Sequence, residues 1–296
     1  MTIEKITLPI EYWNESKTEV LCSQDVNGRV LECAYFSSVQ FTGYSKHYPM
    51  PLMYSHKDRK LRLPTIERFM SLGRGTVYEE TMKYDMELCS SWSGCHTPVF
   101  YFAYNMANYF HFIYDTLPYL YTYFEEKKTC PDLKLLVSPA EGKDDLYPFV
   151  WETLELLGIT RDDVVFLRQD VIYDYVLVGS SLTHGGLSEK PPHRFTFDII
   201  GRLRGTYEGP ERVYISRRTW MHNNLDNIGT NYTERRRCMN EDQVAQMFID
   251  HGFEEVFCEN LTMKEKIGIF SSAKYVSGPI GCLLYTSPSP RDLSTS

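Results

Sequence analysis

Short apolar runs alternate with amphipathic segments of helical length through the second half of the chain, and this alternation constrains the fold most. Apolar runs that predict strands occupy residues 133–139, 163–167, 173–178, 212–216, 254–257 and 274–277. Amphipathic segments that predict helices occupy residues 148–157, 195–203, 243–251 and 262–272. Strands that alternate with helices build a mainly parallel sheet with helices on both faces. The sequence therefore predicts an α/β protein.

The first 95 residues follow a different pattern, because short β-rich runs are separated there by Gly, Asn and Pro. Such runs predict strands and hairpins at the edge of a domain. The segment KPPH at residues 190–193 predicts a linker. We therefore expect an N-terminal domain over residues 1–190, β-rich over 1–95, and a second βα domain over 191–281.

The last residues depart from the βα pattern altogether. The string CLLYTSPSPRD at residues 282–292 reads as the usual translation of a sequencing-library adapter, not as part of a folded domain. We expect residues 282–296 to be an artefactual or disordered tail. On that hypothesis the natural chain continues beyond Gly281. The second domain is then incomplete in the sequence as given, and this shortened chain could be inactive.

Composition and charge exclude some classes of function. A net charge of −8 with 24% charged residues argues against non-specific binding to nucleic acids or membrane surfaces. No run approaches the ~18 apolar residues of a membrane span, and the N-terminus lacks the apolar core of a signal peptide. We expect a cytoplasmic protein, or one of the ER or Golgi lumen if a signal anchor precedes this sequence. The cysteines show no C-x-x-C pair or zinc-ligand spacing, which predicts scattered reduced thiols.

Residues 105–124 (NMANYFHFIYDTLPYLYTYF) predict one amphipathic helix with an unusual polar side. At 3.6 residues per turn an apolar stripe forms from Met106, Phe110, Ile113, Leu117, Leu120 and Phe124. The opposite side carries Tyr104, Asn108, His111, Asp115 and Thr122. His111 and Asp115 lie one turn apart there, and Pro118 predicts a kink because it has no N–H. This pair could act in catalysis, or it could simply meet solvent or cap a neighbouring segment.

Several motifs of the chain resemble those of the family 61 glycosyltransferases, also known as the DUF563 or capsular-polysaccharide-biosynthesis-like family. N-Y-F-H-F-x-x-D-x-L-P, which begins at Asn108, is similar to the signature helix of that family. The later segments similar to it, in order and spacing, are R-V-Y-I-S-R-R, R-R-x-x-N-E-D, G-F-E-E-V, L-T-M-K-E-K-I-x-I-F-S-S-A and G-P-I-G. Two residues depart from the family pattern: Ile280 stands where His is frequent, and Lys266 where Gln is frequent.

The resemblance implies a GT-B-like fold of two Rossmann-like, doubly wound domains, the second of them incomplete here. It also implies inverting transfer of a sugar from a nucleotide-sugar donor to a hydroxyl of a glycan or protein. Such a transfer needs a general base for the hydroxyl proton, a role open to either His111 or Asp115. We expect Asn108 and His184 on the acceptor side of the cleft. The chain has no D-x-D motif, and the D-x-E of Asp85 and Glu87 reads as surface, so we expect no metal or other cofactor.

The leaving diphosphate needs positive charge or N–H dipoles, which arginines and helix N-termini can supply. Arg217 and Arg218 follow a predicted strand directly, at the end where ligands bind in doubly wound domains. We assign Glu241 to the same side, and the turn from Gly278 to Gly281 could let the backbone approach the donor. The alternative for the two arginines is a surface pair that solvates a strand end.

Two other classes of function remain open from the sequence. The first is a metal-dependent hydrolase or transferase that uses His96, His111, Asp115 and His184. The second is a non-catalytic carbohydrate-binding or scaffold protein built on a decayed glycosyltransferase fold.

Overall fold

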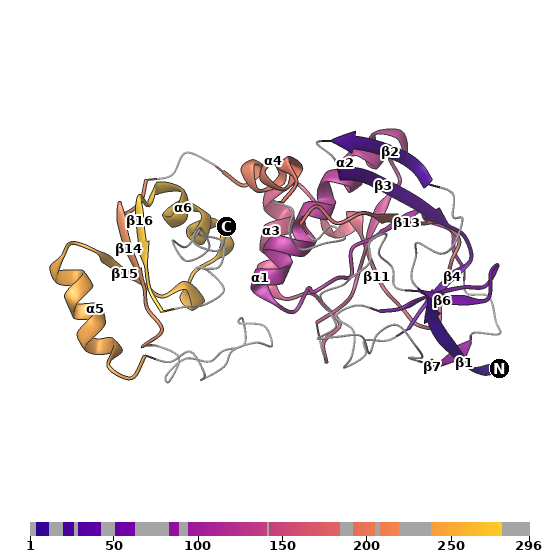
Figure 1. The fold of residues 1–296 in the computed structure, drawn as a ribbon, viewed down its shortest axis with the longest axis horizontal. Coiled ribbons are helices and arrows are strands. Elements are labelled where there is room, and N and C mark those ends of the chain that lie inside the picture. Colours follow the sequence, from indigo (N-terminus) through magenta and orange to yellow (C-terminus); the bar gives the residue numbers. More distant parts are fainter. Residues whose placement is uncertain are drawn as a thin grey trace.

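The computed structural model describes residues 4–11, 20–26, 29–42, 51–62, 83–88, 94–140, 142–183, 192–204, 208–218 and 238–279 (Figure 1). His184, Gly281 and the expected tail at 282–296 lie outside these residues. The described strands form three sheets, with helices beside them. The predicted α/β class is confirmed.

The central sheet has six strands in the order β11-β10-β9-β13-β3-β2. Four neighbouring strands are parallel, as the βα pattern predicts: β9 (Val99–Tyr101), β10 (Lys134–Val137), β11 (Val164–Phe166) and β13 (Val176–Gly179). β3 (Arg29–Phe36) joins β13 in antiparallel orientation and carries β2 (Val20–Val26) at the edge. The helix α3 (Pro148–Leu156) connects β10 to β11.

A second sheet has seven short strands in the order β7-β1-β6-β5-β4-β12-β8. Its members are β1 (Glu4–Glu11), β4 (Val39–Phe41), β5 (Met53–Ser55), β6 (Lys60–Arg62), β7 (Lys83–Leu88), β8 (Gly94–Cys95) and β12 (Ile172–Tyr173). Most of its strand pairs are antiparallel, in keeping with the hairpins predicted for the N-terminal region. Asp85 and Glu87 both lie in β7, and Glu87 is exposed.

The prediction of one strand over residues 173–178 is wrong. The chain leaves the seven-stranded sheet after Tyr173 and joins the six-stranded sheet at Val176. Between these points the Asp174 N–H donates to the Cys95 carbonyl, and the Val99 N–H donates to the Tyr175 carbonyl. Apolar patterning indicates both strands but not the strands with which each one pairs. The two strands were therefore predicted as one.

The predicted helix at 105–124 is a composite of four segments. It consists of α1 (Tyr109–His111), a π turn (Phe112–Thr116), a 3₁₀ turn (Leu117–Tyr119) and α2 (Leu120–Thr129). It begins at Tyr109 and not at residue 105, because the Asn108 side chain accepts the N–H groups of Phe110 and His111 and so caps the first turn. Pro118 offers no N–H, and the helical hydrogen-bond pattern changes around it.

The apolar stripe of this helix is only partly buried, and its polar side is not uniformly exposed. Asp115 and Thr122 are buried, whereas Phe110 and Ile113 are only partly buried. The π turn adds a residue to one turn and therefore rotates the faces that a regular helix would present.

The third sheet has three parallel strands in the order β15-β14-β16, formed by β14 (Arg212–Ile215), β15 (Glu254–Val256) and β16 (Tyr275–Ser277). Helices α5 (Glu241–Asp250) and α6 (Met263–Ser272) lie on opposite sides of it (Figure 1). Thr262 and Glu265 form a capping box that starts α6. Asn240 precedes α5, and its side chain makes no capping hydrogen bond.

α4 (Arg194–Arg202) precedes the third sheet in the chain. The described helices include none that is both long and apolar enough to cross a membrane. The described thiols of Cys95, Cys130, Cys238 and Cys258 form no disulfide.

Candidate active site

The candidate site lies at the carboxyl ends of two neighbouring parallel strands. The composite helix follows β9, and the segment that ends at Thr183 follows β13. Because β9 and β13 are parallel neighbours, the segments that follow them meet at one edge of the sheet. Ligands in α/β proteins bind at this kind of edge.

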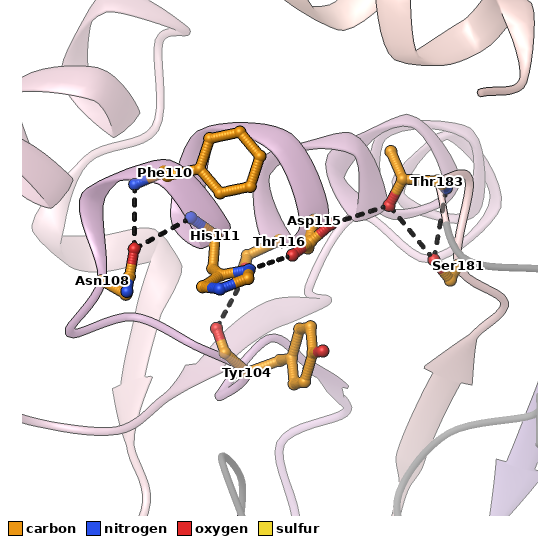
Figure 2. A network of polar contacts seen from close by, with 8 residues as sticks. All are labelled: Tyr104, Asn108, Phe110, His111, Asp115, Thr116, Ser181 and Thr183. Carbon is orange, nitrogen blue, oxygen red and sulfur yellow. Dashed lines mark hydrogen bonds and ion pairs between the residues drawn. The ribbon is translucent and has the colours of Figure 1, made fainter. Parts of the chain in front are cut away.

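His111 and Asp115 form a close polar pair at this edge (Figure 2). The Nδ1 atom of His111 lies 2.5 Å from Oδ2 of Asp115. The Asp115 side chain is only 1% exposed, whereas that of His111 is 42% exposed. With Nδ1 against the carboxylate, Nε2 is the ring nitrogen that can exchange a proton with a bound molecule. The pair thus has the arrangement of a general base and the group that orients it.

Two hydroxyl residues after β13 support the carboxylate, and the sequence patterns above identified neither. The Thr183 hydroxyl donates to Oδ1 of Asp115 at 3.2 Å, and the Thr183 N–H donates to the Ser181 hydroxyl oxygen at 3.2 Å. The signal that could have found them is the run Ser180-Ser181-Leu182-Thr183 directly after a buried strand. Polar side chains at that place face the edge where ligands bind.

Neighbouring groups hold the helix in place on its other side. The Thr116 hydroxyl donates to the Tyr104 carbonyl at 2.6 Å. Burial, and then the charge of Asp115, raises the pKa of the Tyr104 phenol, which stays protonated beside the carboxylate. Asn108, expected on the acceptor side, uses its side-chain oxygen as the helix cap, at 3.1 Å from the Phe110 nitrogen and 3.2 Å from that of His111.

A second His–Asp pair lies at the opposite edge of the sheet. His96 precedes β9, and its Nδ1 atom lies 2.5 Å from Oδ2 of Asp174, which precedes β13. The His96 side chain is 83% exposed. The metal-site hypothesis needed His96 and His111 together, but they flank opposite ends of β9. Within the described ranges no group of three or more His, Cys, Asp or Glu side chains could hold a metal ion.

On the three-stranded sheet, the two arginines after β14 differ in their surroundings. The Arg218 guanidinium pairs with Glu255 and with Asp242, at 3.1 Å from the latter, and these ion pairs raise its pKa. The Arg217 N–H donates to Oε1 of Glu241 at 2.6 Å. Glu241 is 5% exposed and also accepts the Ser216 hydroxyl at 3.3 Å. Glu241 thus holds the backbone at the end of β14.

Gly278 follows β16, the parallel neighbour of β14, and lies at the same edge. A Cβ atom at this position would lie 2.6 Å from the Ile215 carbonyl oxygen. Only glycine allows so close an approach of the two strand ends.

Helix α6, which follows β15 in the chain, contacts α3 and the start of the composite helix. The Met263 N–H donates to Oε2 of Glu152 on α3 at 2.6 Å, and the Tyr109 hydroxyl donates to the Met263 sulfur at 3.4 Å. The Lys266 ammonium lies 5.2 Å from the centre of the Tyr109 ring. Lys266 is 8% exposed, and burial lowers its pKa. Tyr109 stands two residues before His111, so the two parts of the chain meet next to the candidate base.

Comparison with known proteins gives one match. A family model described as Glycosyltransferase 61 matches residues 109–289, a range that includes His111, Asp115, Thr183 and the three-stranded sheet. No curated protein and no solved structure matches the chain.

Proposed function

The chain belongs to glycosyltransferase family 61, and we propose that it transfers a sugar from a nucleotide-sugar donor to a hydroxyl group of a glycan or protein. The transfer inverts the anomeric centre and uses no metal ion. The observation that carries the proposal is the contact of His111 with the buried carboxylate of Asp115 at the carboxyl edge of the parallel strands. In a GT-B-like arrangement this edge would be the acceptor side, and the three-stranded sheet the donor side.

His111 is the general base in this proposal. Nε2 takes the proton of the acceptor hydroxyl as the hydroxyl oxygen bonds to the anomeric carbon, and the bond from that carbon to the diphosphate oxygen breaks. Asp115 orients the imidazole and stabilises the imidazolium that forms. The exposures favour this division of roles, since His111 is 42% exposed and Asp115 only 1%. A positioned base of this kind contributes about 10²–10⁴-fold to the rate.

Arg217 is the donor-side residue that we propose for the leaving diphosphate. Arg218 follows the same strand, and its guanidinium forms ion pairs with Glu255 and Asp242. Glu241 supports Arg217 through its backbone, and Gly278 brings the end of β16 close to the end of β14. A guanidinium suits the oxygens of a diphosphate because its N–H groups can donate in pairs.

The test compares the two His–Asp pairs of the sheet. His111→Ala and Asp115→Asn should each lower transfer by at least about 10²-fold in the full-length protein. The readout is release of nucleoside diphosphate from a panel of nucleotide sugars with glycan acceptors, with the products identified by mass spectrometry. His96→Ala and Asp174→Asn change a pair with the same contact distance at the other edge and should leave transfer near the wild-type level.

Circular dichroism and thermal melting of all four variants show whether the fold is retained. Near-full activity in both His111→Ala and Asp115→Asn would remove the pair from the mechanism.

A further inference from the structure

The carboxylate of Asp115 has different partners on its two oxygens. Oδ2 lies against Nδ1 of His111 at 2.5 Å, and Oδ1 accepts the Thr183 hydroxyl at 3.2 Å (Figure 2). Asp115 is 1% exposed, so bulk water does not solvate its charge. A buried carboxylate is stable only when hydrogen bonds replace that water. The Thr183 bond therefore helps to keep the carboxylate charged and to determine its rotation.

Ser181 in turn holds Thr183 in place. The Thr183 N–H donates to the Ser181 hydroxyl oxygen at 3.2 Å, and the two hydroxyl oxygens lie 3.5 Å apart. Both residues are buried, at 6% and 4% exposure. A β-branched side chain has few accessible χ1 rotamers, so the Thr183 hydroxyl has a defined direction.

The close packing of β13 on the helix supports the same contact. A Cβ atom at Gly179 would lie 3.0 Å from Phe100 Cζ and 3.5 Å from Thr122 Cβ. The absence of a side chain at Gly179 thus lets the end of β13 lie against β9 and α2. Four residues later the chain reaches Asp115 with Thr183.

We propose that Thr183 is a positioning residue for the transfer reaction, which acts by holding Asp115 so that Oδ2 stays on Nδ1 of His111. Ser181 supports it by fixing the Thr183 backbone. The consequence is that neutral His111 carries its proton on Nδ1 and leaves the Nε2 lone pair for the acceptor hydroxyl. This assignment rests on the proposed function, because it concerns the same base.

Thr183 touches neither donor nor acceptor in this assignment. Its loss should therefore lower kcat and leave the KM values for donor and acceptor unchanged. The expected loss is roughly 10- to 100-fold, the range seen when the outer partner of a functional His is removed or a reacting group is slightly misplaced.

The test is a spectroscopic measurement of the His111 tautomer in the full-length protein. Two-bond ¹⁵N–¹H couplings of the neutral imidazole are recorded, and His111→Gln identifies the signal. The wild type should show the Nδ1–H tautomer. Thr183→Val has nearly the same shape but no hydroxyl, and should give a mixture of the two tautomers with the fall in kcat. Thr183→Ser keeps the hydroxyl and should restore the wild-type tautomer.

Each outcome decides the assignment. A single Nδ1–H tautomer in folded Thr183→Val, or an equal loss of kcat in Thr183→Ser and Thr183→Val, would overturn it. If Thr183→Val does not fold, Ser181→Ala provides the test, because it removes the partner of Thr183 and should give a mixture of tautomers as well.

The tautomer does not depend on activity, so it separates this assignment from the proposed function. If His111→Ala is fully active, the proposed function fails. If His111→Ala is inactive and Thr183→Val keeps the wild-type tautomer, only the role of Thr183 fails.

Discussion

Replacement of Lys266 by methionine should stabilise the protein. Lys266 is 92% buried on α6, and its ammonium faces the ring of Tyr109 at 5.2 Å. In the described part of the chain no group forms a hydrogen bond or ion pair with its Nζ atom; Cys258, Glu152, Glu259 and Glu265 act on it only at longer range. A charge on a largely buried side chain with only distant counter-charges lowers the stability of the folded state.

Three effects set the size of the expected gain. Replacement of buried charged groups by apolar side chains of similar volume is neutral or stabilises by up to about 1–4 kcal/mol. Loss of the cation–π contact with Tyr109 costs about 0.5–2 kcal/mol. Methionine keeps the apolar stem and its contacts. We therefore expect Lys266→Met to raise the free energy of unfolding by about 1–2 kcal/mol near neutral pH.

The gain should depend on pH. Burial lowers the pKa of Lys266 in the folded state below its ordinary value near 10.4. Between the folded and the ordinary pKa, the unfolded chain binds more protons at this group than the folded chain does. The contribution of Lys266 to the free energy of unfolding therefore rises with pH across that interval. The difference between Lys266→Met and the wild type should thus shrink as the pH rises from 7 to about 10.

Urea unfolding at several pH values, followed by tryptophan fluorescence, measures this difference. Lys264→Met is the matched control, because Lys264 is an exposed lysine of the same helix. The control should change stability by less than about 0.5 kcal/mol, with the pH dependence of the wild type. Destabilisation by Lys266→Met of about 3 kcal/mol or more would refute the reasoning, since losses of that size mark a broken buried ion pair. Equal pH slopes in the wild type and Lys266→Met would also refute it.

Three further predictions concern the glycine and the two arginines that follow strands of the three-stranded sheet. Gly278→Ala should destabilise the protein by about 1–3 kcal/mol in urea unfolding, because the added Cβ atom would lie 2.6 Å from the Ile215 carbonyl oxygen. The control is Gly201→Ala on α4, where an added Cβ atom has no neighbour within 4 Å and should stabilise the protein by about 0.5–1 kcal/mol. Equal effects of the two substitutions would contradict the steric argument. Arg217→Ala should weaken the binding of a nucleoside diphosphate at least about tenfold in calorimetry with little change in Tm, and unchanged affinity would exclude Arg217 from the donor site. Arg218→Ala should lower the free energy of unfolding by about 1 kcal/mol, because the Arg218 guanidinium is paired with carboxylates, and should leave the affinity for the nucleoside diphosphate intact. A loss of that affinity equal to the loss in Arg217→Ala would show that Arg218 also binds the diphosphate.

The sequence by itself determined the α/β class and the positions of most strands and helices in the second half of the chain. The helices predicted over residues 148–157 and 262–272 correspond to α3 and α6. Gly158, with φ of 78°, follows the end of α3, and the capping box of Thr262 and Glu265 begins α6. The spacing of His111 and Asp115 also placed the two side chains one helical turn apart. These features depend on residues within one turn or one strand of each other, so local patterns are sufficient to reveal them.

Only the tertiary structure decided which segments lie side by side. It separated Ile172–Tyr173 from Val176–Gly179 by pairing them with different sheets, and it buried Asp115 on what looked like a polar face. It also brought Thr183 to Asp115 across 68 residues of chain. Hydrophobic periodicity indicates which side of an element is apolar but not what covers either side. The order of strands in the sheet determines that, and with it the partners of every side chain at the candidate site.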